Sequence, residues 1–336
     1  MTPATATATK PRQLRFGNAL NEALREELRR DERVFVMGVD VQIGVYASVR
    51  GLASEFGNRR ILNTPISELA VAGAAVGAAV VGMRPVAHLM NSTFMYLGMD
   101  QLVNQAGLMR YMFGGQAILP ITYMATTGGM GSKAAHHSQS LYSLFMNTPG
   151  LKVVLPSTPY DAKGLLKAAI REDNPVIFLE HGALGGTRGP VPDEDYLVPL
   201  GVAEVKRAGS DVTVVATGLM VPRALKAAEA LAGQGIDCEV VDPRTLYPLD
   251  RETIRQSVRK TGRLVAVDEA NYTCGAAAEV LASALEDGQV RWRGPARRVA
   301  VPDVPIPFSP PLERAVIPDE GRIVAAVREV MGHHGG

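Results

Sequence analysis

The sequence has 336 residues, of which 46% are hydrophobic and 21% are charged. At roughly 150 residues per domain this length predicts two domains, and the composition excludes a disordered chain and a disulfide-stapled small scaffold. The formal net charge of +1 predicts no nucleic-acid partner and no attraction to an anionic membrane.

The first predicted elements are a helix and a buried strand. We expect a disordered lead over 1–11, because its start alternates Thr and Ala. Apolar residues at helical spacing then predict an amphipathic helix over 16–28, and 34–37 is typical of a buried strand. The uncharged stretch 69–83 is shorter than the ~20 residues that cross a bilayer, so we expect a buried helix and no membrane span.

Strand-like and helical runs alternate through the rest of the first half. Short apolar strands separated by helices predict a parallel sheet covered on both faces, which we place in a first domain over 12–185. The predicted strands are 85–90, 120–125, 151–155 and 175–180, and the predicted helices are 99–111, 138–145 and 160–170.

A Gly- and Pro-rich stretch follows, which predicts a linker without regular structure over 186–200. A second alternating series then predicts a domain over 201–331, so the expected fold is α/β with two doubly wound domains. Cys238 and Cys274 lack metal-ligand spacing, which favours a reducing, cytoplasmic compartment. The predicted strands are 211–216, 237–241, 264–267 and 299–301, and the predicted helices are one ending at 232 and those at 250–260, 276–286 and 323–331.

The general phosphate, nucleophile and zinc motifs are missing, but Glu68 stands out. This carboxylate lies between a Pro-stiffened turn and the apolar helix that begins at residue 69, where it risks burial. A buried acid must be paired, or its pKa rises and it can donate a proton. The alternative is an acidic residue that favours the helix dipole, and the residues alone leave both interpretations open.

A glycine-rich loop over 128–132 precedes a second candidate, the adjacent imidazoles of His136 and His137. They stand where a helix should begin, and imidazoles titrate near physiological pH. Ser138 as a helix cap beside two surface histidines is the simpler interpretation, and it is favoured on these residues alone.

Further motifs run in collinear order with these two segments over 12–331. They are Thr64-Pro-Ile-Ser-Glu68, Gly82-Met-Arg-Pro, Met99-Asp-Gln-Leu-Val-Asn-Gln-Ala, Tyr111-Met-Phe-Gly-Gly, His137-Ser-Gln, Pro149-Gly-Leu-Lys-Val-Val, Asn174-Pro-Val-Ile, Asp242-Pro-Arg-Thr-Leu-Tyr-Pro-Leu-Asp250 and Val304-Pro-Ile-Pro-Phe-Ser-Pro-Pro-Leu-Glu313. This order resembles the β subunit of the thiamine diphosphate-dependent 2-oxo acid dehydrogenases of pyruvate, acetoin or branched-chain type, within the transketolase superfamily.

The resemblance implies a pyrimidine-binding domain at 12–185 and a transketolase C-terminal-like domain at 201–331. It also implies roles for single residues. Glu68 would hydrogen-bond the aminopyrimidine nitrogen of thiamine diphosphate and drive its tautomerisation, while Ile66 and Phe94 would lie against the same ring. His137 would face the reacting carbonyl and move protons during acyl release.

The resemblance also implies metals and partners. The family holds diphosphate and magnesium with a Gly-Asp-Gly segment, which this chain lacks, so an α subunit would supply that half of the site in an α2β2 assembly. An acyl-accepting lipoyl or carrier protein would be a further partner. A potassium site formed mainly by backbone oxygens would lie at Ile121, Ala169, Ile170, Glu172 and Asn174.

Two departures from the family pattern concern the substrate. His88 stands where an acidic residue is usual, and Met124-Ala-Thr-Thr replaces a basic loop. With His136, His88 would give a polar pocket similar to that of transketolase. The alternative, which we favour, is that His88 packs inside the sheet and His136 faces solvent.

Three functions are therefore considered. The first is the β subunit of an enzyme that decarboxylates a small 2-oxo acid and acylates a lipoyl group. The second is a transketolase-like transfer of two carbons from a ketose to a carrier protein. The third, a catalytically silent interaction subunit, is disfavoured because both Glu68 and His137 are present.

Overall fold

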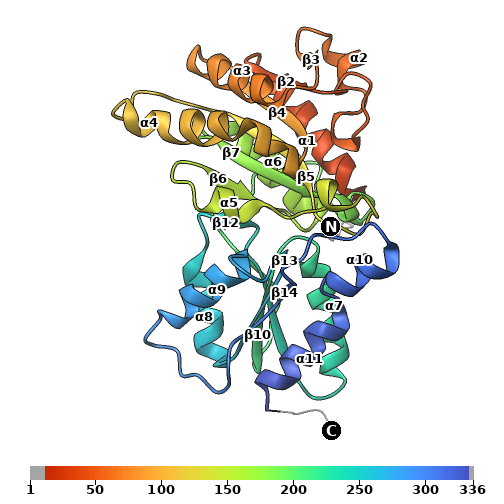
Figure 1. Cartoon of the computed structure of the whole chain (residues 1–336), viewed down its shortest axis with the longest axis vertical. Coiled ribbons are helices and arrows are strands. Elements are labelled where there is room, and N and C mark those ends of the chain that lie inside the picture. The colour runs from red at the N-terminus through yellow and green to blue at the C-terminus, as the bar shows by residue number, and fades with distance from the viewer. Residues whose placement is uncertain (1–11, 333–336) are drawn as a thin grey trace, which may run out of the picture.

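Three sheets organise the chain, and the computed structural model describes residues 12–332. A seven-stranded sheet belongs to the first half of the chain and a five-stranded sheet to the second half, and Figure 1 shows one above the other. Within the described residues, no helix is long and apolar enough to cross a membrane. The expected lead over 1–11 lies outside the described residues.

The larger sheet has the order β12-β6-β7-β5-β4-β2-β3, and all of its pairs are parallel except β12 with β6. This confirms the predicted parallel sheet, to which the second half of the chain adds the edge strand β12. The strands are β2 (Val34–Gly38), β3 (Ile61–Asn63), β4 (Arg84–Asn91), β5 (Thr122–Thr127), β6 (Lys152–Val154), β7 (Val176–His181) and β12 (Thr245–Tyr247).

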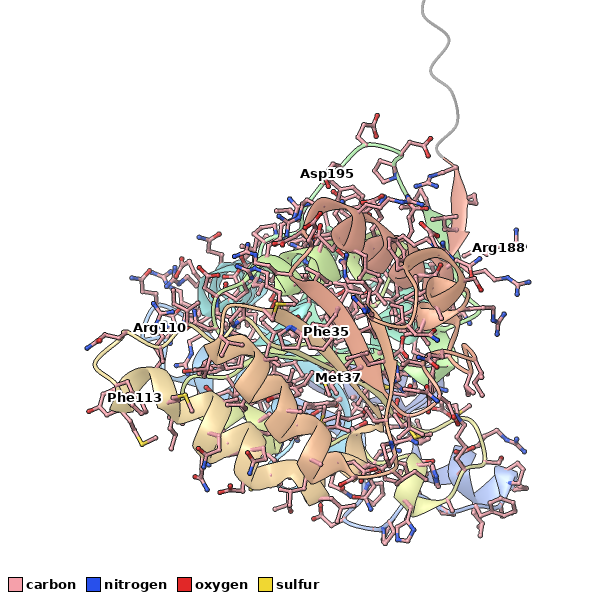
Figure 2. All side chains as sticks on the ribbon, turned by 90° about the horizontal axis from the view of Figure 1, so that it is seen from above. Phe35, Met37, Arg110, Phe113, Arg188 and Asp195 are labelled. Carbon is pink, nitrogen blue, oxygen red and sulfur yellow. The ribbon has the colours of Figure 1, made fainter. Side chains whose placement is uncertain are left out.

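Helices cover both faces of this sheet, because successive strand residues alternate between them. In β2, Val34 and Val36 pack toward α1 and α6, whereas Phe35 and Met37 pack toward α3 and η3. Figure 2 shows Phe35 and Met37 within the molecule. The helical elements are α1 (Phe16–Arg30), η1 (Ala47–Val49), α2 (Leu52–Phe56), α3 (Glu68–Val80), η2 (Ser92–Gly98), η3 (Asp100–Gly107), α4 (Leu108–Met112), η4 (Ala135–His137), α5 (Tyr142–Met146), α6 (Pro159–Arg171) and η5 (Gly182–Leu184).

The second sheet has the order β14-β13-β10-β11-β9, with β9 antiparallel at one edge. Helices α7 and α11 pack on one face, and α8 and α9 on the other, as expected for a doubly wound domain. The elements are β9 (Glu204–Arg207), β10 (Val212–Ala216), α7 (Met220–Ala232), β11 (Cys238–Asp242), α8 (Arg251–Thr261), β13 (Leu264–Asn271), α9 (Ala276–Leu285), β14 (Arg297–Val301), α10 (Pro310–Val316) and α11 (Glu320–Val330).

Three sequence predictions are wrong. The helix expected to be buried over 69–83 packs on the sheet with one face only, and Leu69 and Val80 are 50% and 56% exposed on its other face. The linker contains a short strand, β8 (Arg188–Pro190), which pairs antiparallel with β1 (Gln13–Arg15); such a pair needs only backbone groups, so a Gly-Pro sequence can form it. The helix predicted over 138–145 begins only at Tyr142, because the loop before it continues past η4 in non-helical conformations. The helix predicted over 99–111 is present, but its first part, η3, is π-helical.

Candidate functional site

The first site residue, Glu68, opens helix α3 directly after the Pro65 turn. Its side chain is buried, with only 7% of the residue exposed, and it lines a cavity of about 10 Å³. Within 12–332, its carboxylate has no hydrogen-bond or ion-pair partner. The helix dipole favours a negative charge at this end, so Glu68 combines the two interpretations left open by the sequence. It is a helix-end acid, and it is also buried without a protein partner.

His88 lies in β4 and lines the same small cavity as Glu68. It is buried, its ring contacts that of Tyr46 in a tilted arrangement with centroids 4.6 Å apart, and its Nδ1 accepts the Met90 amide at 3.3 Å. Its Nε2 has no hydrogen-bond partner and lies 3.9 Å from a carboxylate oxygen of Glu180. Burial, with a smaller effect of Glu180, raises the pKa of Tyr46 to about 12. His88 therefore packs inside the sheet, as the favoured alternative held, while bordering the cavity at Glu68.

Phe94 and His137 are in direct contact. Phe94 lies in η2 and His137 in η4, and their rings meet edge to face with centroids 5.3 Å apart. The Ser92 hydroxyl donates to the Gln139 carbonyl at 3.0 Å, and the Thr93 hydroxyl donates to the His136 carbonyl. Side chains of η2 thus fix the segment that carries both histidines.

The expected site residues converge through adjoining elements. Helix α3 packs on η2, and η2 packs on η4, so Glu68, Phe94 and His137 belong to neighbouring elements. The close approach of α3 and η2 favours a glycine at position 98, where a Cβ would lie 3.3 Å from the Glu68 carbonyl oxygen and would crowd it. Ile66 is 77% exposed beside Glu68, and His136 and His137 are also exposed.

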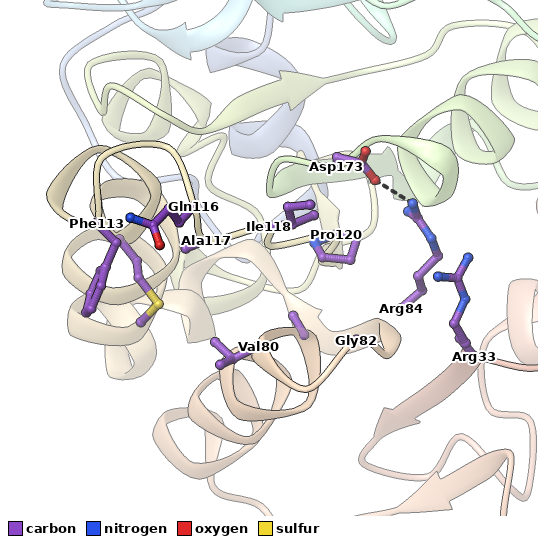
Figure 3. A pocket seen from close by; sticks show the side chains of 12 residues that line it. Arg33, Val80, Gly82, Arg84, Phe113, Gln116, Ala117, Ile118, Pro120 and Asp173 are labelled. Carbon is purple, nitrogen blue, oxygen red and sulfur yellow. Dashed lines mark hydrogen bonds and ion pairs between the residues drawn. The ribbon is translucent and has the colours of Figure 1, made fainter.

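The positions expected for potassium gather where α6 ends. The carbonyl oxygens of Ile170 and Glu172 accept from the Arg84 guanidinium at 2.9 and 3.1 Å, and the Asn174 side-chain oxygen accepts from Arg110 at 3.2 Å. Figure 3 shows Arg84 pointing toward Asp173 at one end of a cavity of about 640 Å³. A guanidinium thus already supplies positive charge here.

Ile121 and Ala169 also lie in this region, and their carbonyl oxygens accept backbone amides at 2.8 and 3.3 Å. Each carbonyl oxygen has two lone pairs, and the Arg84 guanidinium occupies one on Ile170 and one on Glu172. Among the described residues, no group of three or more His, Cys, Asp or Glu side chains is placed to hold a metal.

Three buried residues that contact the loop 128–132, just before the two histidines, were not predicted from the sequence. His181 at the end of β7 lies 2.7 Å from a carboxylate oxygen of Glu269 in β13, and the other oxygen of Glu269 accepts the Gly129 amide at 2.6 Å. Glu313 accepts the amides of Gly131 and Ser132. The available signal was the acidic pair Asp268-Glu269 at the carboxyl end of a buried strand.

Burial opposes the ionisation of Glu269, but the neighbouring His181 and the Gly129 amide together hold the pKa of this carboxyl below its usual value. Its neighbour Asp268 behaves in the opposite way. Burial raises the pKa of Asp268, even though Tyr142 and Thr217 donate hydrogen bonds to it. Adjacent acids at the end of β13 therefore both contact the first domain, with Glu269 favoured as the charged one.

Comparison with known proteins gives two family matches. The description "Transketolase, pyrimidine binding domain" matches residues 12–186, and "Transketolase, C-terminal domain" matches residues 201–323. Together they span most of the chain.

Similar proteins include three β subunits. The acetoin:2,6-dichlorophenolindophenol oxidoreductase subunit beta of Bacillus subtilis is 44% identical, over 96% of this chain and 98% of its own length. The 2-oxoisovalerate dehydrogenase subunit beta of the same organism is 43% identical, over 93% and 97%. The pyruvate dehydrogenase E1 component subunit beta of Rickettsia felis is 42% identical, over 95% and 98%.

A similar solved structure is a split gene transketolase, described as an inactive beta4 tetramer. It superposes with a TM-score of 0.75 at 27% identity, and the match covers 94% of this chain and 97% of that one.

Proposed function

Because the chain belongs to the β subunits of the thiamine diphosphate-dependent 2-oxo acid dehydrogenases, we propose that Glu68, Phe94 and His137 form its half of the active site. The reaction is decarboxylation of a small 2-oxo acid with transfer of the acyl unit to a lipoyl group. The observation that carries the site assignment is a buried, unpartnered carboxylate, Glu68, in a helix that packs on η2, the element whose Phe94 ring contacts His137.

Thiamine diphosphate, when bound, supplies the carbon acid that attacks the 2-oxo group. Glu68 would hold a proton at the aminopyrimidine nitrogen, and a carboxylate with no protein partner is free to do so. Ile66 and Phe94 would pack against the pyrimidine, which explains why the apolar Ile66 is left exposed in the single chain. His137, exposed and oriented by Phe94, would move protons at the reacting carbonyl.

An α subunit would complete the site and hold the diphosphate and magnesium, because this sequence has no Gly-Asp-Gly segment. The outer surfaces of α3 and α4 support an α2β2 assembly. Leu69, Val81, Tyr111 and Phe113 are exposed on them, and Tyr111 is 89% exposed. Apolar side chains of this kind are typical of a large subunit interface. Figures 1 and 2 show the end of α4, with Phe113, at the edge of the molecule.

Donor assays with the purified α/β pair test the proposed reaction. We expect reduction of a lipoyl acceptor with pyruvate, acetoin or a branched-chain 2-oxo acid. Product from a ketose phosphate instead would favour the transketolase-like alternative, in which a carrier protein accepts two carbons. The β subunits that are more than 40% identical favour the dehydrogenase reaction.

His88 and His136 stay candidates for substrate contact. His88 supports this role because it lines the Glu68 cavity and its Nε2 has no hydrogen-bond partner, and His136 by its exposure. His88→Asn and His136→Asn are expected to raise KM for the donor several-fold. Unchanged KM values would remove both residues from the site.

Potassium would bind the carbonyl oxygens around Arg84 at the end of α6. A higher unfolding temperature in KCl than in NaCl of equal ionic strength is the expected result, and equal temperatures would contradict it. A cytoplasmic location agrees with Cys238 and Cys274, which are both free thiols. Fractionation of the cells that make the protein would test the location.

A further inference from the structure

The loop before His137 adopts an unusual backbone conformation. Gly128 has φ +84°, and the non-glycine residues Met130, Ser132 and Ala134 have φ of 67°, 50° and 59°. Side chains of L-residues disfavour this left-handed region, so alternate positions of the loop are strained. Strain of this kind persists only where the surroundings hold the backbone in place.

Two carboxylates of the second domain hold this backbone. Glu313 in α10 accepts the amide of Gly131 at 3.2 Å and that of Ser132 at 3.1 Å. Glu269 at the end of β13 accepts the amide of Gly129 at 2.6 Å. Successive amides in such a conformation form a concave anion-binding site, and here two protein carboxylates fill it. Both glutamates are buried, and the Gly129–Glu269 hydrogen bond is itself buried, whereas Gly131 lies at the surface.

The loop also lies too close to the second domain and to β7 for side chains at its first two positions. A Cβ at Gly128 would lie 2.0 Å from the His181 Nε2, and a Cβ at Gly129 would lie 2.4 Å from the Ile317 side chain. His181 in turn contacts Glu269 at 2.7 Å. The loop is therefore packed between the two domains and does not extend freely into solvent.

We propose that Glu313, assisted by Glu269, is a positioning residue for His137. These carboxylates fix the loop up to Ser132, while the hydroxyls of Ser92 and Thr93 fix it around the histidines. The imidazole thus takes its position from both domains. The proposal rests on the proposed role of His137, and it assigns the second domain a part in the active-site geometry.

Glu313→Ala and Glu313→Gln in the assembled α/β holoenzyme test this inference, with Glu320→Gln in α11 as a matched surface control. Hydrogen exchange of the peptide 128–138 reports on the loop, and steady-state kinetics report on the site. For Glu313→Ala we expect at least tenfold faster exchange and at least a tenfold lower kcat, with the dissociation constant of thiamine diphosphate changed less than threefold. Glu313→Gln retains one accepting oxygen and should lie between Glu313→Ala and the native enzyme.

Unchanged exchange in both Glu313 variants would overturn the proposal, and so would faster exchange with an unchanged kcat. If Glu313→Ala fails to assemble, Glu313→Gln carries both measurements. A fully active His137→Ala would instead refute the proposed role of His137, whatever the Glu313 variants show, so the two failures are distinguishable.

Discussion

At the scale of single residues, two side chains serve different proposed proton transfers: the buried acid acts on the cofactor, and the exposed imidazole acts on the substrate. Glu68 has no partner within the described chain, whereas His137 is exposed and held by Phe94. An acid that acts on the cofactor and a base that acts on the substrate must fail at different steps when they are replaced.

Glu68→Gln keeps the size and one hydrogen-bonding group but removes the acid. Turnover of the α/β pair should fall by on the order of 10²–10⁴, the usual range for a lost acid-base group. Deuterium exchange at the reactive carbon of bound thiamine diphosphate should also be lost. Glu194→Gln, on the exposed segment before β9, is the control. Near-normal turnover in Glu68→Gln would mean that this residue is only a helix-end charge.

His137→Ala should retain that deuterium exchange, while acyl transfer to the acceptor falls by about 10²-fold or more. Lys133→Ala, an exposed residue of the same loop, serves as the control. Both readouts are followed in one preparation by magnetic resonance and by acceptor reduction. Equal loss of exchange in His137→Ala and Glu68→Gln would show that His137 supports the cofactor and not the substrate.

At the scale of elements, short apolar runs located the strands β2, β4, β5 and β7, because these strands are buried almost throughout in a sheet covered on both faces. The strands β8 and β12 have three residues each and pair antiparallel at edges, so they leave no such pattern. These two strands form because they pair with strands that are distant in the sequence.

In the candidate site, too, local sequence patterns were predictable and long-range contacts were not. Glu68 could be singled out from its place between a proline turn and an apolar helix, and the family resemblance added Phe94 and His137. Glu269 and Glu313 could not be connected with the loop 128–134 from sequence, because their contacts span 140 and 182 positions along the chain. The loop has positive φ angles at several non-glycine residues, which the sequence does not reveal. The sequence shows only that the loop is rich in glycine.

Charge placed on the exposed apolar surface of α3 should block assembly. Leu69→Asp puts a carboxylate where a subunit interface is proposed, and the residue is exposed in the single chain, so folding should be preserved. We expect at least tenfold weaker capture of the α subunit, with an unchanged unfolding temperature of the isolated chain. Val304→Asp, an exposed apolar position of the second domain, is the matched control. Full capture by Leu69→Asp would move the interface elsewhere.

At the scale of the whole molecule, a charged cluster joins the two domains. Arg244 donates to Asp161 of α6 at 3.1 Å, and Ser157 donates to Asp242 at 2.5 Å. Burial, followed by repulsion from Asp161, raises the pKa of Asp242 to about 7, although Lys206 opposes this shift. The junction therefore contains a carboxyl that is protonated under mildly acidic conditions.

The raised pKa fixes the sign of a pH effect. A carboxyl with a higher pKa in the folded chain binds more protons there than in the unfolded chain, so its contribution to stability is complete below about pH 4 and is lost as the pH rises through about 7. Asp242→Asn should remove this loss between pH 4 and 7, as measured by urea unfolding. Asp287→Asn, at a carboxyl with a lowered pKa, should not. Parallel pH profiles for the native chain and Asp242→Asn would contradict the assignment.

This chain is proposed to form one half of a thiamine diphosphate site, and cofactor binding tests the division between two subunits most directly. Titration calorimetry with thiamine diphosphate and magnesium is carried out on the isolated chain, on the isolated α subunit and on the α/β pair. We predict tight binding only by the pair, at least 10²-fold stronger than by the isolated chain, because the diphosphate-binding segment belongs to the α subunit. Tight binding by the isolated chain would contradict the shared site.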